Sequence, residues 1–252
     1  MDFTVKKYNE LLRSLIDQDY SFQTFEEFLK APKARSIILR HDVDLMPANS
    51  LAFARIQANQ NIKGVYYFRA VPESWDEAVI KEIASLGHEI GYHYECLTTC
   101  DGNLEKGIKD FESNLNKLRK LAPVVTICMH GSPMSKYDSK DLWKHYNYRD
   151  YQIIGEPYFD VDFREVFYIT DTGRRWDGDK VSVRDKVNSS FNLSFHTTQQ
   201  IIEAAQKNKL PDKIMMTFHP QRWNDNLFNW SKELVVQNIK NIVKLGLIRL
   251  RS

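Results

Sequence analysis

Short apolar runs alternate with longer amphipathic stretches along most of the chain. The apolar runs are predicted to be strands, at residues 36–40, 64–68, 88–92, 124–128 and 213–218. The amphipathic stretches are predicted to be helices, at residues 47–61, 74–86, 104–121, 197–208 and 230–245. Two further segments, 152–154 and 166–169, are strand-like. The alternation predicts an α/β fold with a mostly parallel sheet, closed or partly closed into a barrel.

Local signals support the helix boundaries and a single domain. Ser74 is the expected N-cap of its helix, with Glu77 completing a capping box, and Gly87 stands where a C-cap glycine belongs. No repeat, low-complexity tract or Pro/Gly/Ser-rich linker interrupts the sequence. We therefore expect one domain over residues 1–252, with residues 1–35 forming a helical extension packed on it.

Acidic and histidine side chains follow five of the predicted strands. They are Asp42 with Asp44, His93, His130, Asp171 and His219. In (β/α) barrels the reactive residues gather at the carboxyl ends of the strands. Any one of these side chains could simply cap a helix or a turn, but their occurrence at five strand ends favours a shared site.

The segment His41-Asp42-Val43-Asp44 is the strongest of these signals. Two carboxylates two residues apart point in similar directions if the chain is extended. One can bind a divalent cation while the other accepts a proton from water that the cation has made acidic. The alternative is a pair of capping or calcium-binding aspartates.

Four further positions complete the candidate site. His93 is a good metal ligand, and Glu95 lies on the same side of an extended segment. His130 sits in a Gly/Pro loop that brings it toward the site, unless it is a turn histidine bonded to backbone. His219 ends the last strand and is the expected general acid.

The loop from Asp171 to Trp176 carries a carboxylate, two guanidinium groups and an indole. Asp171 is suited to orienting a histidine. We expect Arg174, Trp176 and the later Trp223 to contact a sugar, because aromatic faces stack on sugar rings. The alternative for the loop is an ordinary surface ion pair.

Composition narrows the remaining possibilities. The net charge of +2 is spread without a basic stripe, so a nucleic-acid partner is not expected. The amino terminus lacks the pattern of a secretory signal, and no apolar run is long enough to span a membrane. Three cysteines are an odd number, which argues against a disulfide framework. The chain is expected to be cytoplasmic.

The order of these motifs resembles the NodB-type polysaccharide deacetylases (carbohydrate esterase-like), over about residues 36–223. The variant Arg-His-Asp-Val-Asp with Tyr-His-Tyr-Glu looks like a divergent branch found among surface-polysaccharide biosynthesis proteins. The resemblance implies a distorted (β/α) barrel that holds a divalent metal, usually zinc. It also implies residue roles: Asp42 as base, Asp44 and His93 as metal ligands, His219 as acid, and Asp171 as its support.

One departure from the family concerns the metal. The family's second ligand histidine stands four residues after the first, where this chain has Leu97. We expect Glu95 to be the third ligand, and His130 is the alternative. A further alternative is that the site binds metal weakly or has lost it. His130 also stands where the family has an arginine in the third motif, so we expect the base to be restrained differently.

These expectations define three hypotheses. The first is a metal-dependent hydrolase that removes an N-acetyl or related acyl group from a sugar or polysaccharide precursor, in which His130 assists catalysis. The second, motivated by Leu97, is a non-catalytic carbohydrate-binding protein with a degenerate site. The third is an amidohydrolase that acts on a non-sugar C–N bond.

Overall fold

A parallel seven-stranded sheet forms the core of the computed structural model, which describes residues 1–177 and 187–251. The strands are β1 (Ser21–Gln23), β2 (Ser36–Val43), β3 (Val65–Phe68), β4 (Glu89–Tyr94), β5 (Ile127–Met129), β6 (Phe167–Thr170) and β7 (Lys213–Phe218). Their order is β5-β4-β3-β2-β7-β6, with β1 paired to the first half of β2, and every recorded pairing is parallel. Within the described residues the edge strands β5 and β6 do not pair. The predicted partly closed (β/α) barrel is confirmed.

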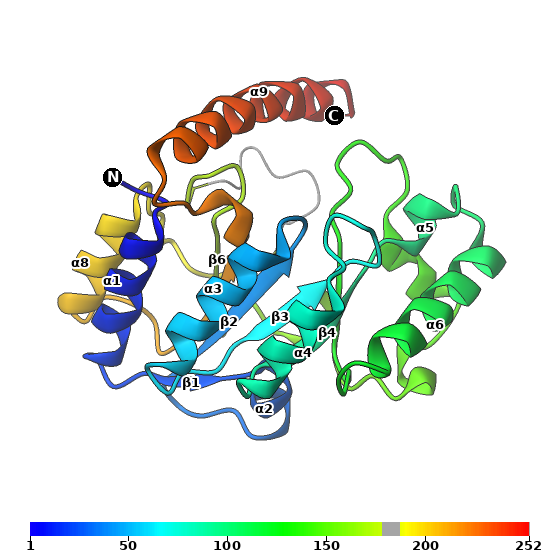
Figure 1. Ribbon diagram of the computed structural model, residues 1–252, viewed down its shortest axis with the longest axis horizontal. Coiled ribbons are helices and arrows are strands. Elements are labelled where there is room, and N and C mark those ends of the chain that lie inside the picture. Colours follow the sequence, from blue (N-terminus) through cyan, green and yellow to red (C-terminus); the bar gives the residue numbers. More distant parts are fainter. Residues whose placement is uncertain (178–186, 252) are drawn as a thin grey trace.

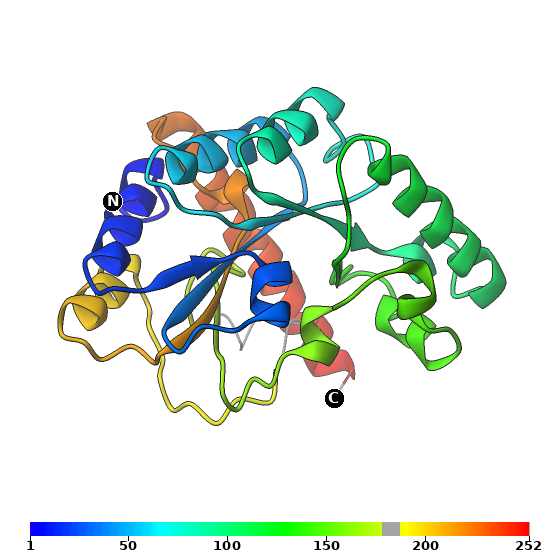
Figure 2. The same ribbon diagram turned by 90° about the horizontal axis from the view of Figure 1, so that it is seen from below.

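Helices cover the outer face of the curled sheet. The helices are α1 (Val5–Ile16), α2 (Phe25–Lys30), α3 (Pro47–Ala58), α4 (Glu77–Ser85), α5 (Cys96–Thr99), α6 (Leu104–Arg119), α7 (Pro157–Asp160), α8 (Thr198–Gln206) and α9 (Leu227–Arg251). In Figure 2, α8, α1, α3, α4 and α6 form an arc around the sheet. None of the helices in the described part of the chain is long and apolar enough to cross a membrane.

The amphipathic pattern explains why these helices pack on the sheet. On α1 the buried side chains are Tyr8, Leu11, Leu12 and Leu15, which share one face because the helix repeats every 3.6 residues. The strands show no such alternation: all eight residues of β2 are buried. Strands of a parallel sheet have both faces covered, so a continuous apolar run is their expected signature.

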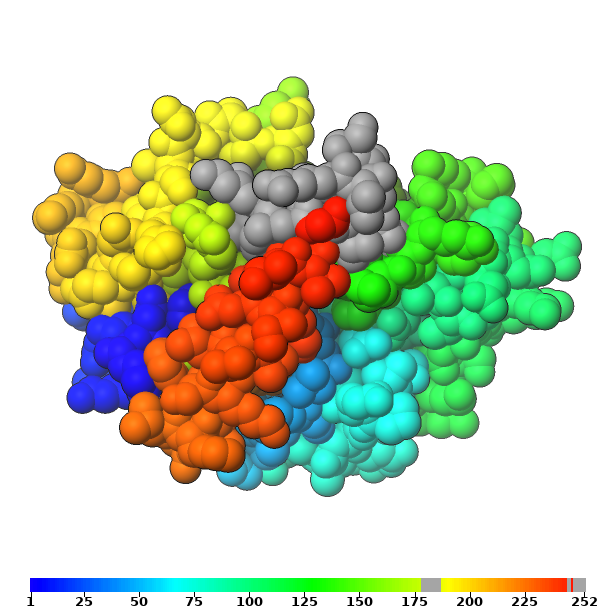
Figure 3. Space-filling model, turned by 90° about the horizontal axis from the view of Figure 1, so that it is seen from above, coloured from blue at the N-terminus to red at the C-terminus, as the bar shows by residue number. Residues whose placement is uncertain are grey.

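Helix α9 lies over the end of the sheet toward which β2 and β3 point (Figure 1) and runs across that face of the molecule (Figure 3). Three contacts hold it there. Arg174 Nη1 donates to the carbonyl of Trp230 at 2.7 Å, Trp230 Nε1 donates to the carbonyl of Asp2 at 2.7 Å, and Asn241 Nδ2 donates to the carbonyl of Gly173 at 2.9 Å.

Three expectations about local structure differ from what is found. Asp76, not Ser74, caps α4, because the Ser74 hydroxyl donates to the carbonyl of Val43 instead. Residues 152–154 form no strand, since Gln152 has a φ of 60° and ends a 3-10 turn. The segment 1–35 is not only helical, because it contributes β1 to the sheet.

A buried acid lies at the start of β4. Glu89 is 8% exposed and accepts hydrogen bonds from the Glu26 amide at 2.8 Å and from the Thr126 hydroxyl. Burial raises the pKa of Glu89 from 4.5 to about 7, although these hydrogen bonds act in the opposite direction.

This carboxyl group is expected to make folding stability fall as the pH rises. The folded chain keeps a proton on Glu89 up to a pKa of about 7, whereas the unfolded chain releases it near 4.5. The stability that the protonated Glu89 contributes is therefore complete below its pKa in the unfolded chain. It is lost as the pH rises through its pKa in the folded chain. Relative to the parent, Glu89→Gln should gain stability between about pH 5 and pH 8 in urea denaturation. A stability difference that does not change with pH would contradict this assignment.

Candidate active site

Three potential metal ligands converge at the carboxyl ends of β2, β4 and β5. They are Asp44, His93 and His130, whose ligand atoms all lie within 4.8 Å of one another. Asp44 Oδ1 is 3.7 Å from His93 Nε2 and 3.4 Å from His130 Nε2. Parallel strands bring these residues together because their carboxyl ends meet at one edge of the sheet.

The hydrogen bond that each imidazole makes through Nδ1 indicates that Nε2 is the atom available to bind metal. His93 Nδ1 lies 2.9 Å from the carbonyl of Cys128, and His130 Nδ1 lies 3.0 Å from Glu95 Oε2. Both acceptors place a proton on Nδ1, so in the neutral form of each ring the lone pair is on Nε2, the atom that faces Asp44. Burial lowers the pKa of His93 to about 4, although the neighbouring aspartates raise it, so this ring is neutral at physiological pH.

These lone pairs fit a divalent cation. Asp44 Oδ1 is buried and has no hydrogen-bond partner among the residues that the structure describes. A carboxylate oxygen that faces two unprotonated nitrogens is costly unless a cation or a donor lies between them. Two imidazoles and one carboxylate are a common zinc set, and they leave a coordination position open.

Glu95 lies beside this group and is not part of it. Arg69 Nε donates to Glu95 Oε1 at 2.7 Å, while Glu95 Oε2 accepts from His130. Burial would raise the pKa of Glu95, but the hydrogen bonds from His130 and Arg69 lower it to about 2. Leu97, at the position of the family's missing histidine, is 3% exposed and belongs to the hydrophobic core.

Asp42, the expected base, is held by an arginine two residues earlier on the same strand. Arg40 donates from Nε to Asp42 Oδ1 at 2.8 Å and from Nη2 to Oδ2 at 2.7 Å, and both side chains are buried. Burial raises the pKa of Asp42, but the Arg40 charge, its hydrogen bonds and the nearby His93 and His219 together hold the pKa below its usual value. Asp42 Oδ2 is also 3.7 Å from His93 Nε2, so the carboxylate borders the metal group.

Sequence reasoning missed Arg40. The available signal was its spacing, because residues two apart in a strand point to the same face. A buried arginine on the face of the expected base is a natural counter-ion, and a bidentate pair fixes the carboxylate plane. Arg40 thus fixes the orientation of the Asp42 carboxylate.

His219, the expected acid, also borders the group formed by Asp44, His93 and His130. Its Nδ1 is 2.5 Å from Asp171 Oδ1, and its Nε2 is 3.9 Å from Asp44 Oδ2. Asp171 is fully buried and accepts further hydrogen bonds from Arg222 at 3.1 Å and from the Trp223 indole at 2.7 Å. Burial raises the pKa of Asp171, but His219 and Arg222 together bring it below its usual value. A charged Asp171 keeps a proton on His219 Nδ1 and orients the ring.

The three residues expected to contact sugar are largely buried. Trp223 is 1% exposed and donates its indole proton to Asp171. Trp176 is 4% exposed and donates to Thr198 Oγ1 at 2.9 Å. The guanidinium of Arg174 lies 4.2 Å from the centre of the Trp230 ring. In this arrangement Trp223 holds Asp171, the partner of His219, and Arg174 anchors α9.

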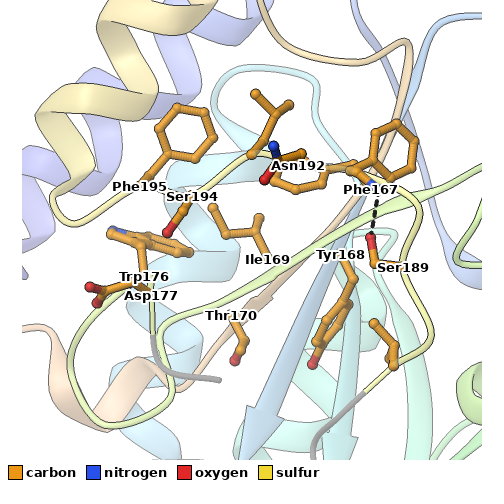
Figure 4. A pocket seen from close by; sticks show the side chains of 13 residues that line it. Phe167, Tyr168, Ile169, Thr170, Trp176, Asp177, Ser189, Asn192, Ser194 and Phe195 are labelled. Carbon is orange, nitrogen blue, oxygen red and sulfur yellow. Dashed lines mark hydrogen bonds between the residues drawn. The ribbon is translucent and has the colours of Figure 1, made fainter. Parts of the chain in front are cut away.

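A cavity of about 530 Å³ lies along β6, separate from the metal group. Figure 4 shows Trp176, Phe167 and Phe195 around it together with polar side chains such as Asn192. It shares Trp176 with the expected sugar contacts but contains none of Asp42, Asp44, His93, His130 and His219.

No protein-family model and no curated protein matches the chain. Solved structures do. A CE4 family pseudoenzyme from Bacillus anthracis aligns with 90% of this chain at 12% identity and a TM-score of 0.40, and the chain spans 66% of that protein. A CE4 esterase from Streptococcus mutans aligns with 87% of the chain at 13% identity and a TM-score of 0.44, over 85% of its own length.

A third solved structure is the Xyl-CE4 domain of a multidomain xylanase from the hindgut metagenome of Trinervitermes trinervoides. It aligns with 85% of the chain at 10% identity and a TM-score of 0.40, over 85% of its own length. These similarities concern the fold. The branch associated with surface-polysaccharide biosynthesis stays a prediction.

Proposed function

We propose that this chain is a metal-dependent hydrolase that removes an N-acetyl or related acyl group from a sugar or polysaccharide precursor. The observation that carries the proposal is that a carboxylate and an imidazole both border one metal-binding group. Asp42 Oδ2 is 3.7 Å from His93 Nε2, and His219 Nε2 is 3.9 Å from Asp44 Oδ2. Hydrolysis of an amide needs a base for the attacking water and an acid for the leaving nitrogen.

Asp44, His93 and His130 would hold the metal, and zinc suits this donor set. When bound, the metal would polarise the acyl carbonyl and make the nearby water more acidic. Asp42 accepts the proton of the water as its oxygen bonds to the carbonyl carbon. His219 donates a proton to the nitrogen as the C–N bond breaks, which releases the carboxylic acid and the sugar amine. Asp171 orients His219 for this transfer.

Metal removal tests the proposal. Zinc-loaded protein is expected to release acetate from at least one member of a panel of N-acetylated sugars and oligosaccharides. Dialysis against a chelator should abolish the release, and one equivalent of zinc should restore it. Bound zinc is measured in parallel by atomic absorption. Release from small amides but from no sugar would support the amidohydrolase alternative. Absence of release from every substrate by fully zinc-loaded protein would contradict the proposal.

A further inference from the structure

Gln221 is a nearly buried amide beside the proposed metal group. Its side chain contacts the site directly: Gln221 Nε2 donates a hydrogen bond to Asp44 Oδ2 at 3.3 Å. The residue is 9% exposed, and its Oε1 is buried without a hydrogen-bond partner among the described residues. Such an acceptor is costly to leave unpaired. The proposed hydrolysis assigns no role to Gln221.

The local chain geometry places Gln221 next to the proposed acid. Gln221 and His219 flank Pro220, in the 3-10 turn Pro220–Arg222 that follows β7. His219 Nε2 lies 3.9 Å from Asp44 Oδ2, the same oxygen to which Gln221 donates. The Gln221 amide and His219 Nε2 therefore approach the same oxygen of Asp44, and the proposed role of His219 as acid places the leaving atom of a substrate close to both.

The orientation of the amide follows from its partner. Asp44 Oδ2 is an acceptor, so the Gln221 group that faces it is the NH₂, and the free atom is the carbonyl oxygen. That oxygen accepts hydrogen bonds and donates none. The leaving nitrogen of an N-acyl sugar carries a hydrogen, whereas the leaving oxygen of an O-acyl sugar carries none.

We propose that Gln221 selects N-acyl over O-acyl substrates by accepting a hydrogen bond from the N–H of the scissile amide. The inference rests on the proposed function and names its substrate class. Holding the N–H toward Gln221 turns the nitrogen lone pair, which forms as the carbonyl carbon becomes tetrahedral, toward His219. An ester has no N–H to donate, so it gains nothing from this contact. The lone pairs of its leaving oxygen would instead face the carbonyl oxygen of Gln221 and be repelled by it.

The test uses substrate pairs that differ only in N–H for O. Methyl glycosides of glucose and galactose that carry either an acetamido or an acetoxy group at C-2 supply two such pairs. For zinc-loaded Gln221→Met, kcat/KM for the amide should fall about 10-fold more than kcat/KM for the ester, the effect of one buried hydrogen bond. Gln237→Met is the matched control, because Gln237 is also buried but pairs with Asn241 on α9. Its amide-to-ester ratio should equal that of the parent.

A binding measurement separates this inference from the proposed function. Calorimetry on zinc-loaded protein with the additional change Asp42→Asn should show about 10-fold weaker binding of the amide after Gln221→Met, with a smaller change for the ester. An equal loss for both members of a pair, or no loss, overturns the inference even if hydrolysis is metal-dependent. A loss specific to the amide without any turnover sustains the Gln221 contact and overturns the hydrolase. Failure of the parent to bind or cleave any of the amides overturns the inference.

Discussion

Asp42→Asn is expected to lower kcat for deacetylation by about 10³-fold, within the range observed for removal of a general base. Asparagine keeps the size of the side chain but cannot accept a proton from the attacking water. The three proposed metal ligands are unchanged, so the zinc content should match that of the parent. Turnover close to the parent value in a zinc-loaded Asp42→Asn protein would exclude Asp42 as the base.

The same substitution should also destabilise the fold, because of Arg40. Asp42 is the bidentate partner of this guanidinium, whose side chain is 1% exposed. Removing one member of a buried ion pair typically costs about 3–5 kcal/mol, since the remaining charge is left without a partner. Urea denaturation should therefore give a lower unfolding free energy for Asp42→Asn. The double variant Arg40→Met/Asp42→Asn should recover much of the stability and none of the turnover.

A matched pair elsewhere in the chain provides the control. Asp162 and Arg164 have the same two-residue spacing and a contact of 2.6 Å, but their side chains are 41% and 69% exposed. Asp162→Asn should change neither turnover nor stability appreciably, because exposed ion pairs contribute little. Equal destabilisation by the two aspartate substitutions would show that burial of Arg40 is not the cause.

Much of the site was predictable because the fold places it by a simple rule. Asp42 and His93 lie near the carboxyl ends of β2 and β4, and His219 directly follows β7. A sequence that alternates strands and helices already implies that these ends meet. The functional pattern could therefore be found without knowing which strands are neighbours. The role of each residue stays a prediction.

The features that could not be predicted from the sequence depend on contacts between segments that are far apart in the chain. The position of α9 over the sheet rests on contacts such as that between Arg174 and Trp230, which no periodicity encodes. The burial of Trp223 beneath the site likewise follows from its packing against Phe3 and Phe218. Glu95 and His130 could not be ranked as ligands either, because they lie 35 residues apart and touch each other.

The structure does rank these two residues as ligands, because His130, and not Glu95, faces Asp44 and His93. We therefore expect His130→Ala to weaken zinc binding more than Glu95→Gln does. Removal of His130 deletes a lone pair that faces Asp44 Oδ1 at 3.4 Å. Glu95→Gln keeps that lone pair and weakens only the acceptor for the Nδ1 proton, so it should cost about 10–100-fold in affinity. Zinc affinity is measured at pH 7 by competition with a chromophoric chelator, which requires no turnover.

The double variant decides how Glu95 acts. If Glu95 acts only by orienting His130, Glu95→Gln should have little further effect on zinc affinity once His130 is alanine, and the two changes will be strongly non-additive. If Glu95 is itself the third ligand, as the spacing of Tyr-His-Tyr-Glu first suggested, its removal should have the larger effect in both backgrounds. Arg69 argues for the first outcome, because it already binds the Glu95 oxygen that does not face His130. Because both of its oxygens are engaged in this way, we expect Glu95 to orient His130, and we expect zinc affinity to depend on the imidazole that it holds.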